Sequence, residues 1–296
     1  MVTALLLLGL SPTADAGTLR VDMLDVGQAD SILITTPAGK RVLIDAGKGS
    51  TDASEQLQRM GVDKLNLVVA THPHQDHIGG MKSVLENIEV GLYLDSGQAH
   101  TTKTYGALME AVETLEVPYQ AALSEQVFNL DDGIVMTVLW PGERPLRGTR
   151  SDHNSNSVVI RLDHGQSCFL FTGDAEEPTE HAVMRLQDLP VADCDVLKVA
   201  HHGSDHSTTD AWLRTVNPSI ALISCGRDNS YGHPGQSTVD KLRQSGVAIY
   251  RTDETGHITV QSDGTTIAVT DGLPSSATGG NIATSLGVEA PIRSIQ

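Results

Sequence analysis

The segment 71–80 restricts what this chain can fold into more than any other part of the sequence. It reads Thr-His-Pro-His-Gln-Asp-His-Ile-Gly-Gly and directly follows the apolar run 65–70, which we expect to be a buried strand. Imidazole and carboxylate groups are ligands for zinc, manganese and iron. Four such groups can surround an ion if the chain turns between a strand and a helix, and they are His72, His74, Asp76 and His77. The alternative is a polar surface loop that contains three histidines.

The apolar patterns around this segment predict an α/β fold. Short β runs come first, with turn residues between them, and strands and helices then alternate in both halves of the chain. Two halves of this kind predict two sheets packed together with helices outside. We expect strands at 18–23, 31–35, 41–44, 65–70, 91–94, 134–140, 158–162, 168–171, 196–199 and 220–223, and helices at 52–60, 105–115, 178–186, 209–216 and 238–244.

The two ends of the chain differ in composition from its middle. An apolar run at 4–10 and the Ala-Asp-Ala at 14–16 predict that residues 1–16 are a signal peptide for export to the periplasm or beyond. A disordered or membrane-anchoring N-terminus is the alternative, because a basic flank is missing. We expect one domain at 17–271 and a disordered tail at 272–296. No later run reaches the ~18 apolar residues that a membrane span needs, so we expect no membrane span in the mature chain.

Charge and cysteine content narrow the function classes. The formal net charge of −17 argues against stable binding of duplex nucleic acid. The 3% aromatic content argues against a nucleic-acid platform built on stacked rings. A phosphate substrate stays compatible, because bound divalent cations would invert the potential locally. The three cysteines, Cys168, Cys194 and Cys225, lack metal-finger spacing. We expect buried thiols, or one disulfide if the protein is exported. The oligomeric state cannot be inferred from the sequence.

The pattern His-x-His-x-Asp-His-x-Gly-Gly after a strand resembles the signature of the metallo-β-lactamase superfamily. Further motifs at 24–31, 201–204, 224–234 and 250–253 resemble the metallo-β-lactamase-like domain of the ComEC competence proteins and their stand-alone relatives. This resemblance implies an αββα sandwich of two mixed β-sheets flanked by helices. The competence proteins also carry a membrane channel, which this sequence does not show, so we do not extend a role in DNA uptake to it.

The resemblance also implies a site for two divalent metal ions, with zinc expected first and manganese or iron as alternatives. In this scheme His72 and His74 bind one ion, Asp76 and His77 bind the other, and Asp174 bridges both. Asp174 also stands where it would cap the helix that follows, and the two roles are compatible.

Other implied ligands each have a plainer alternative. His202 matches the last histidine ligand and the adjacent His201 takes a role near the site, although the division between them is ambiguous. His153 either completes the shell of the first ion or is a solvated loop histidine. Asp45 either fixes the geometry of the ligands or is a turn residue before a glycine.

The implied chemistry is hydrolysis of a phosphoester, of the phosphodiesterase or nuclease type, by a hydroxide that bridges the two metals. Asp76, His201, His233 and Asn229 are the expected catalytic residues. Either His201 or His233 could protonate the leaving alkoxide or hold a phosphate oxygen. His233 could instead be a loop histidine, and Asn229 could simply cap the turn. Hydrolysis of a lactam, lactone or thioester remains open, as does a degenerate domain that binds metal without turnover.

Overall fold

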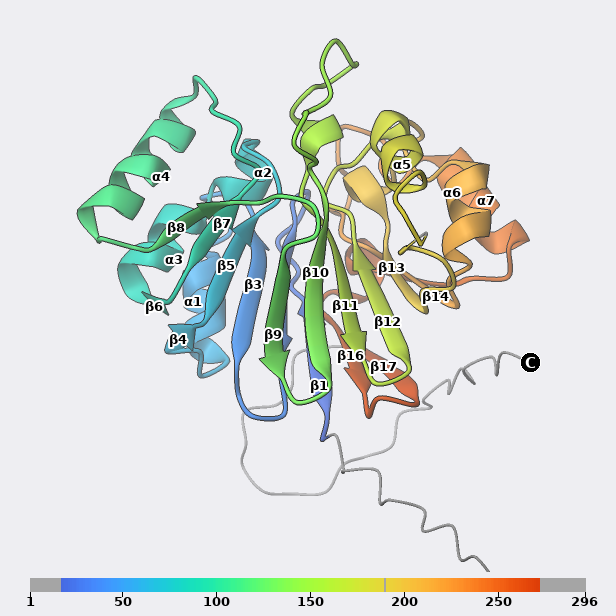
Figure 1. Cartoon of the computed structure of the whole chain (residues 1–296), viewed down its shortest axis with the longest axis horizontal. Coiled ribbons are helices and arrows are strands. Elements are labelled where there is room, and N and C mark those ends of the chain that lie inside the picture. The colour runs from blue at the N-terminus through green and yellow to red at the C-terminus, as the bar shows by residue number, and fades with distance from the viewer. Residues whose placement is uncertain (1–16, 189, 272–296) are drawn as a thin grey trace, which may run out of the picture.

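The computed structural model describes residues 17–188 and 190–271 (Figure 1). The expected signal peptide at 1–16 and the expected tail at 272–296 therefore lie outside the described residues. Within the described part, none of the helices combines the length and the apolar character needed to cross a bilayer.

Two large sheets lie between two layers of helices (Figure 1), which confirms the predicted αββα sandwich of the α/β class. The first sheet has eight strands in the order β17-β16-β1-β2-β3-β5-β7-β8, and the second has seven in the order β15-β14-β13-β12-β11-β10-β9. Both mix antiparallel with parallel pairs. The first-sheet strands are β1 (Leu19–Met23), β2 (Ser31–Thr35), β3 (Arg41–Ala46), β5 (Leu67–Ala70), β7 (Tyr93–Asp95), β8 (Tyr119–Ala121), β16 (Ile258–Ser262) and β17 (Ile267–Asp271).

The second sheet and the helices complete the layers. The second-sheet strands are β9 (Val127–Asp131), β10 (Ile134–Trp140), β11 (Val159–His164), β12 (Ser167–Phe171), β13 (Val196–Lys198), β14 (Ile220–Ile223) and β15 (Ala248–Arg251), and a small ribbon pairs β4 (Lys64–Leu65) with β6 (Glu89–Val90). The helices are α1 (Ala53–Arg59), α2 (Gln75–Ile78), α3 (Met81–Asn87), α4 (Lys103–Thr114), α5 (Glu177–Val183), α6 (Asp210–Val216), α7 (Gln236–Gln244) and α8 (Thr252–Thr255), with 3-10 turns η1 (Asn154–Asn156) and η2 (Ala200–Gly203).

Side-chain alternation along the strands builds three apolar layers. In β3, Val42 and Ile44 pack between the two sheets, whereas Leu43 packs under the helices of the first half. In β12, Phe169 faces the other sheet and Leu170 faces the helices of the second half. Each central strand is therefore buried on both faces, which is why these strands are near-continuous apolar runs in the sequence.

The predicted strands and helices are all present, with small shifts at their ends. The run predicted as one strand at 65–70 is divided at Asn66, whose backbone and side chain both bond to Arg41. Six strands of the described part were not predicted, namely β6, β8, β9, β15, β16 and β17, and neither were the short helices α2, α3 and α8.

A buried aspartate links β1 to the segment around β16. Asp22 accepts hydrogen bonds from Arg20 Nε at 2.6 Å, Thr259 Oγ1 at 2.7 Å and His257 Nε2 at 3.0 Å. Burial raises the pKa of Asp22, but the hydrogen bonds from His257 and Arg20 outweigh it and hold the pKa below the usual value. None of these three partners is a predicted metal ligand.

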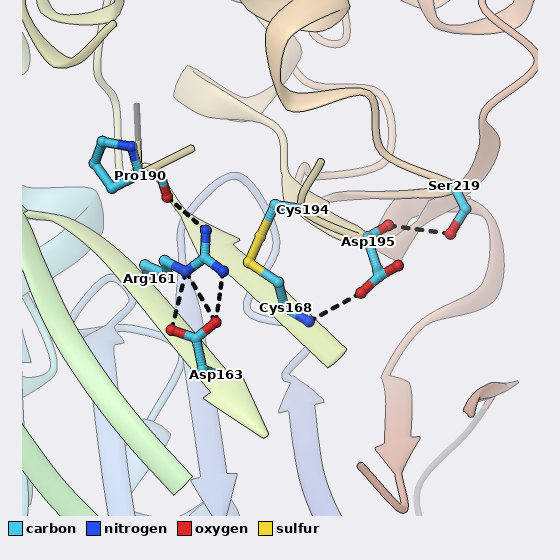
Figure 2. Close-up of a disulfide and its surroundings, with 7 residues drawn as sticks. All are labelled: Arg161, Asp163, Cys168, Pro190, Cys194, Asp195 and Ser219. Carbon is cyan, nitrogen blue, oxygen red and sulfur yellow. Dashed lines mark hydrogen bonds and ion pairs between the residues drawn. A yellow bond between two sulfur atoms is a disulfide. The ribbon is translucent and has the colours of Figure 1, made fainter. Parts of the chain in front are cut away.

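Cys168 of β12 and Cys194, two residues before β13, form a disulfide (Figure 2). Both cysteines are buried in the apolar layer under α5 and α6. Beside the bridge, Cys168 N donates to Asp195 Oδ2 at 2.9 Å. The structure therefore contains the one disulfide that the sequence analysis gave as an alternative to buried thiols, and Cys225 is the expected buried thiol. The bridge closes the stretch of chain that carries Asp174.

Candidate metal centre

The candidate ligands come together because they follow parallel strands. β3, β5 and β7 run parallel in the first sheet, and β12, β13 and β14 run parallel in the second. The carboxyl ends of parallel strands meet at one edge of a sheet. Asp45 is the penultimate residue of β3, and the other candidate ligands follow strands: the segment His72–His77 follows β5, Asp174 follows β12 and the pair His201–His202 follows β13.

The backbone turns sharply at the two adjacent histidines. β13 ends at Lys198, and His201 and His202 both have left-handed φ angles, of 52° and 54°. Strand alternation therefore does not apply to them. His202 is buried, whereas the side chain of His201 is 18% exposed. Left-handed φ angles are uncommon for residues other than glycine and often mark functional sites.

Four side chains place ligand atoms within 4.8 Å of one another, and they are Asp76, His77, Asp174 and His202. His77 Nε2 lies 3.3 Å from Asp174 Oδ1, and His202 Nε2 lies 3.3 Å from Asp76 Oδ2. Three of the buried atoms in this group, His77 Nε2, Asp174 Oδ1 and His202 Nε2, have no hydrogen-bond partner. Buried polar atoms are rarely left unpaired, so the donor set fits a divalent cation.

A second pair of ligand atoms lies beside this group. His72 Nε2 is 3.0 Å from His74 Nδ1 and 3.8 Å from Asp174 Oδ2. The ring of His153 lies 5.7 Å from that of His74. Its Nδ1 lies 3.0 Å from Gln98 Oε1, an acceptor, which leaves Nε2 as the atom with a free lone pair.

Two hydrogen bonds set the tautomers of the central histidines. His77 Nδ1 lies 2.7 Å from Asp45 Oδ2, and His202 Nδ1 lies 2.9 Å from Ser224 O. Both partners are acceptors, so each Nδ1 donates and each Nε2 keeps its lone pair towards the group. Asp45 is itself fixed by Thr71, whose N and Oγ1 donate to it at 2.8 Å and 2.7 Å.

The carboxylates around the group stabilise positive charge. Burial lowers the pKa of His77, but Asp174 and Asp45 outweigh it and raise the pKa well above its usual value. Burial likewise opposes the charged form of His202, yet Asp174 and Asp30 raise its pKa to about 10. Without a metal the imidazoles thus attract protons, which is the behaviour of a site that favours cations.

The expected catalytic histidines lie on the more exposed side of the group. His201 Nε2 is 3.7 Å from Asp174 Oδ2, and its Nδ1 is 3.4 Å from Glu176 Oε1. The ring of His233 lies 5.5 Å from that of His201. Burial, followed by repulsion from His201 and His202, lowers the pKa of His233 to about 4.

Asn229 makes the contacts of a turn cap. Its Oδ1 accepts from the backbone N of Tyr231 at 3.1 Å and of His233 at 3.0 Å. Its Nδ2 donates to Gly226 O at 2.9 Å and to His233 O at 2.5 Å. Both ends of the amide are therefore bonded within the loop, as in the turn-cap alternative, and the residue holds His233 in place.

A family model described as the metallo-beta-lactamase superfamily matches residues 24–227. The chain belongs to the metallo-β-lactamase superfamily. Its relatives include the ComE operon protein 3 of Bacillus subtilis, to which it is 32% identical over 81% of this chain and 32% of that protein. The recombination protein 2 of Haemophilus influenzae is also 32% identical, over 82% of this chain and 29% of that protein. This metallo-β-lactamase chain thus spans about a third of the length of these relatives, and the resemblance to competence proteins is confirmed.

A solved structure shows the same fold. The metallo-beta-lactamase fold protein YhfI from Bacillus subtilis superposes with a TM-score of 0.52, covering 83% of this chain and 100% of that one. The identity is 11%, so this likeness establishes the metallo-β-lactamase fold alone.

Two charged residues in this metallo-β-lactamase site had no role in the sequence analysis. Lys198 is buried, forms an ion pair with Asp30 and donates to Gly173 O at 2.9 Å. Burial raises the pKa of Asp30, but the charge of Lys198 outweighs it and lowers the pKa. Asp30 Oδ1 also lies 3.3 Å from His202 Nδ1. The sequence feature that predicts this pair is a lysine inside an apolar strand, because a buried lysine needs a buried partner of opposite charge.

Proposed function

We propose that the chain is a dinuclear metal-dependent hydrolase of phosphodiesters, with nucleic acid among its substrates. The position of Asp174 carries the proposal. Its Oδ1 lies 3.3 Å from His77 Nε2, and its Oδ2 lies 3.8 Å from His202 Nε2 in the same group and 3.8 Å from His72 Nε2 in the neighbouring histidine pair. A carboxylate that lies between the two sets of histidines is suited to bridge two ions. Divalent ions held there would supply Lewis-acid charge and lower the pKa of a water molecule.

Two histidines outside the ligand groups support a phosphoester as the substrate. His201 and His233 both lie partly exposed beside Asp174, so a substrate that reaches the carboxylate meets both rings. Imidazoles can hold phosphoryl oxygens or give a proton to a leaving alkoxide. A relative named as a recombination protein agrees with nucleic acid as the substrate.

Metal analysis followed by turnover assays tests the proposal. Protein loaded with Zn²⁺ or Mn²⁺ should hydrolyse bis-p-nitrophenyl phosphate and linear DNA, and should not hydrolyse nitrocefin. His74→Ala and Asp174→Ala should each abolish turnover without unfolding the chain. His181→Ala is the matched control, because His181 is an exposed histidine on α5 outside the site. If His153 completes the ligand set of the ion bound by His72 and His74, His153→Ala should lower the metal content.

The outcomes separate the alternatives. Less than one metal per chain, with no turnover after addition of Zn²⁺ or Mn²⁺, would reject an enzymatic function. Turnover of nitrocefin without turnover of phosphodiesters would favour a lactam substrate. We also propose that nucleic acid is held as a substrate without stable duplex binding, given the net charge of −17. Fluorescence anisotropy of a labelled duplex in EDTA should then show no saturable binding.

We further propose that the protein works outside the cytoplasm. The disulfide between Cys168 and Cys194 supports this, because disulfides persist mainly in oxidising compartments. Protein isolated from the periplasm or the medium should begin at Gly17 on N-terminal sequencing, and its only free thiol after denaturation should be Cys225. Cytoplasmic protein with all three thiols free would contradict export.

A further inference from the structure

One side chain joins His233 to the first half of the chain. Gln28 lies in the loop between β1 and β2, and His233 lies in the loop between β14 and α7. Gln28 Nε2 is 3.3 Å from His233 Nδ1. The two loops touch closely at Gly226, where an added Cβ would stand 2.6 Å from the backbone nitrogen of Gln28. A glycine is therefore needed at this position for Gln28 to reach His233.

The orientation of the Gln28 amide follows from its second contact. Gly226 N lies 3.0 Å from Gln28 Oε1. A backbone N–H can only donate, so the oxygen of the amide faces Gly226 and its NH₂ group faces His233. The NH₂ group can only donate as well. His233 Nδ1 must therefore accept this hydrogen bond, and the proton of the neutral imidazole is on Nε2.

We propose that Gln28 is a positioning residue that holds His233 as the Nε2–H tautomer, so that His233 donates a hydrogen bond to a phosphoryl oxygen. This inference rests on the proposed function, phosphodiester hydrolysis. Transfer of a proton to the leaving group requires an imidazolium, whereas a neutral imidazole N–H is a good hydrogen-bond donor and a very weak acid. Protonation of Nδ1 would also set two donors, Gln28 Nε2 and His233 Nδ1, against each other.

The two histidines on the open side of the site consequently have different partners. His233 Nδ1 faces an amide NH₂ group, and His201 Nδ1 faces the carboxylate of Glu176 at 3.4 Å. Of the two rings, only that of His233 has a hydrogen-bond donor at Nδ1, which leaves its N–H on Nε2. The structure thus assigns the holding of a phosphoryl oxygen to His233.

Imidazole ¹⁵N–¹H correlation spectra of the zinc-loaded protein test the tautomer directly. His233, assigned by the signals lost in His233→Asn, should show an unprotonated Nδ1 and a protonated Nε2. In Gln28→Glu a carboxylate of the same shape can accept from both Gly226 N and His233 Nδ1. The Nδ1 signal should then move upfield to the range of a protonated nitrogen.

Thr252→Val is the matched control for loosening of the same loop. Thr252 Oγ1 accepts from Cys225 N and donates to Cys225 O, both at 2.9 Å, and it does not contact Gln28. This variant should leave the tautomer of His233 unchanged. A protonated Nδ1 in the wild-type protein, or an unchanged Nδ1 signal in Gln28→Glu, would overturn the assignment.

The dependence of kcat on the leaving group tests the role of His233 as a hydrogen-bond donor. Thymidine 5′-p-nitrophenyl phosphate has a good leaving group, and a thymidine dinucleotide has a poor one that needs a proton. His233→Asn should lower kcat for both substrates by the same factor, roughly 10²–10³-fold, as for the loss of one oxyanion donor. A clearly larger loss with the dinucleotide would make His233 a proton donor and overturn the role. If the wild-type protein turned over neither substrate, the proposed function and this role would both fall, and the spectra would still decide the tautomer.

Discussion

Asp45→Asn separates the shape of the Asp45 side chain from its hydrogen-bonding pattern. Asp45 Oδ1 accepts from Thr71 N, and Oδ2 accepts from Thr71 Oγ1 and from His77 Nδ1. In asparagine the oxygen keeps the bond from Thr71 N, so an NH₂ group takes the place of Oδ2. An NH₂ group cannot accept from His77 Nδ1. The imidazole must then carry its proton on Nε2, the atom that faces Asp174 at 3.3 Å.

The structure sets the size of the expected effect. A protonated Nε2 has no lone pair for a metal, so the group of Asp76, His77, Asp174 and His202 loses one of its four ligand atoms unless the tautomer reverts. Loss of a residue that orients a histidine ligand typically costs about 10–100-fold in metal affinity. This factor corresponds to about 1.4–2.7 kcal/mol. We expect the ion bound by His77 to weaken by this amount.

Competition between the protein and a chromophoric chelator for Zn²⁺ measures this change. Asp22→Asn is the matched control, because Asp22 is equally buried and accepts a comparable set of hydrogen bonds away from the metal centre. Asp22→Asn should lower the free energy of unfolding measured in urea and leave the affinity for Zn²⁺ unchanged. Equal affinities of wild-type protein and Asp45→Asn would refute the tautomer argument, and so would an equal loss in both variants.

Three further predictions concern the stability of the fold. The pKa of Asp22 is lowered on folding, so its stabilisation is complete above the ordinary value of 3.8 and is lost as the pH falls through the lowered value. Urea unfolding should therefore show a steeper loss of stability in acid for wild-type protein than for Asp22→Asn, and parallel pH profiles would contradict this. Replacing Cys168 and Cys194 by serine opens a loop with a sequence separation of 26 and should lower the free energy of unfolding by about 3.5 kcal/mol. A loss below about 1 kcal/mol in urea denaturation would show that the loop is already constrained in the unfolded chain. Lys198→Met leaves Asp30 buried without its cation and should cost about 3–5 kcal/mol in the same assay. Adding Asp30→Asn should restore most of that loss, and a double variant no more stable than the single one would reject the pairing.

The length and placement of each strand decide whether it can be predicted from the sequence. β10 and β12 are apolar runs buried on one or both faces, and their pattern is visible in any short window. β8 is three residues long and exposed at each of them, so it forms only because it pairs with β7 at the edge of the sheet. β16 owes its place to pairing with β1, more than 230 residues earlier. No local pattern contains that information.

The same distinction applies to the site. The ligands at 72–77 are adjacent in sequence and follow a buried strand, so their spacing alone indicates a metal. The residues that orient them act across long separations. Gln28 meets His233 through a contact between two loops, and Asp30 meets Lys198 inside the molecule. Each is an ordinary polar residue until the fold brings its partner to it.

Charge balance connects the buried lysine to the proposed chemistry. Asp30 and Asp45 cluster with His77, next to the group of Asp76, His77, Asp174 and His202. These residues carry four carboxylates, and Lys198 offsets one of their charges. Metal ligation requires neutral imidazoles, so three negative charges would remain for bound ions to balance. One divalent ion would leave the region negative and repel a phosphodiester, whereas two make it positive. On a chain with a net charge of −17, a second ion is therefore what would let this site attract an anionic substrate.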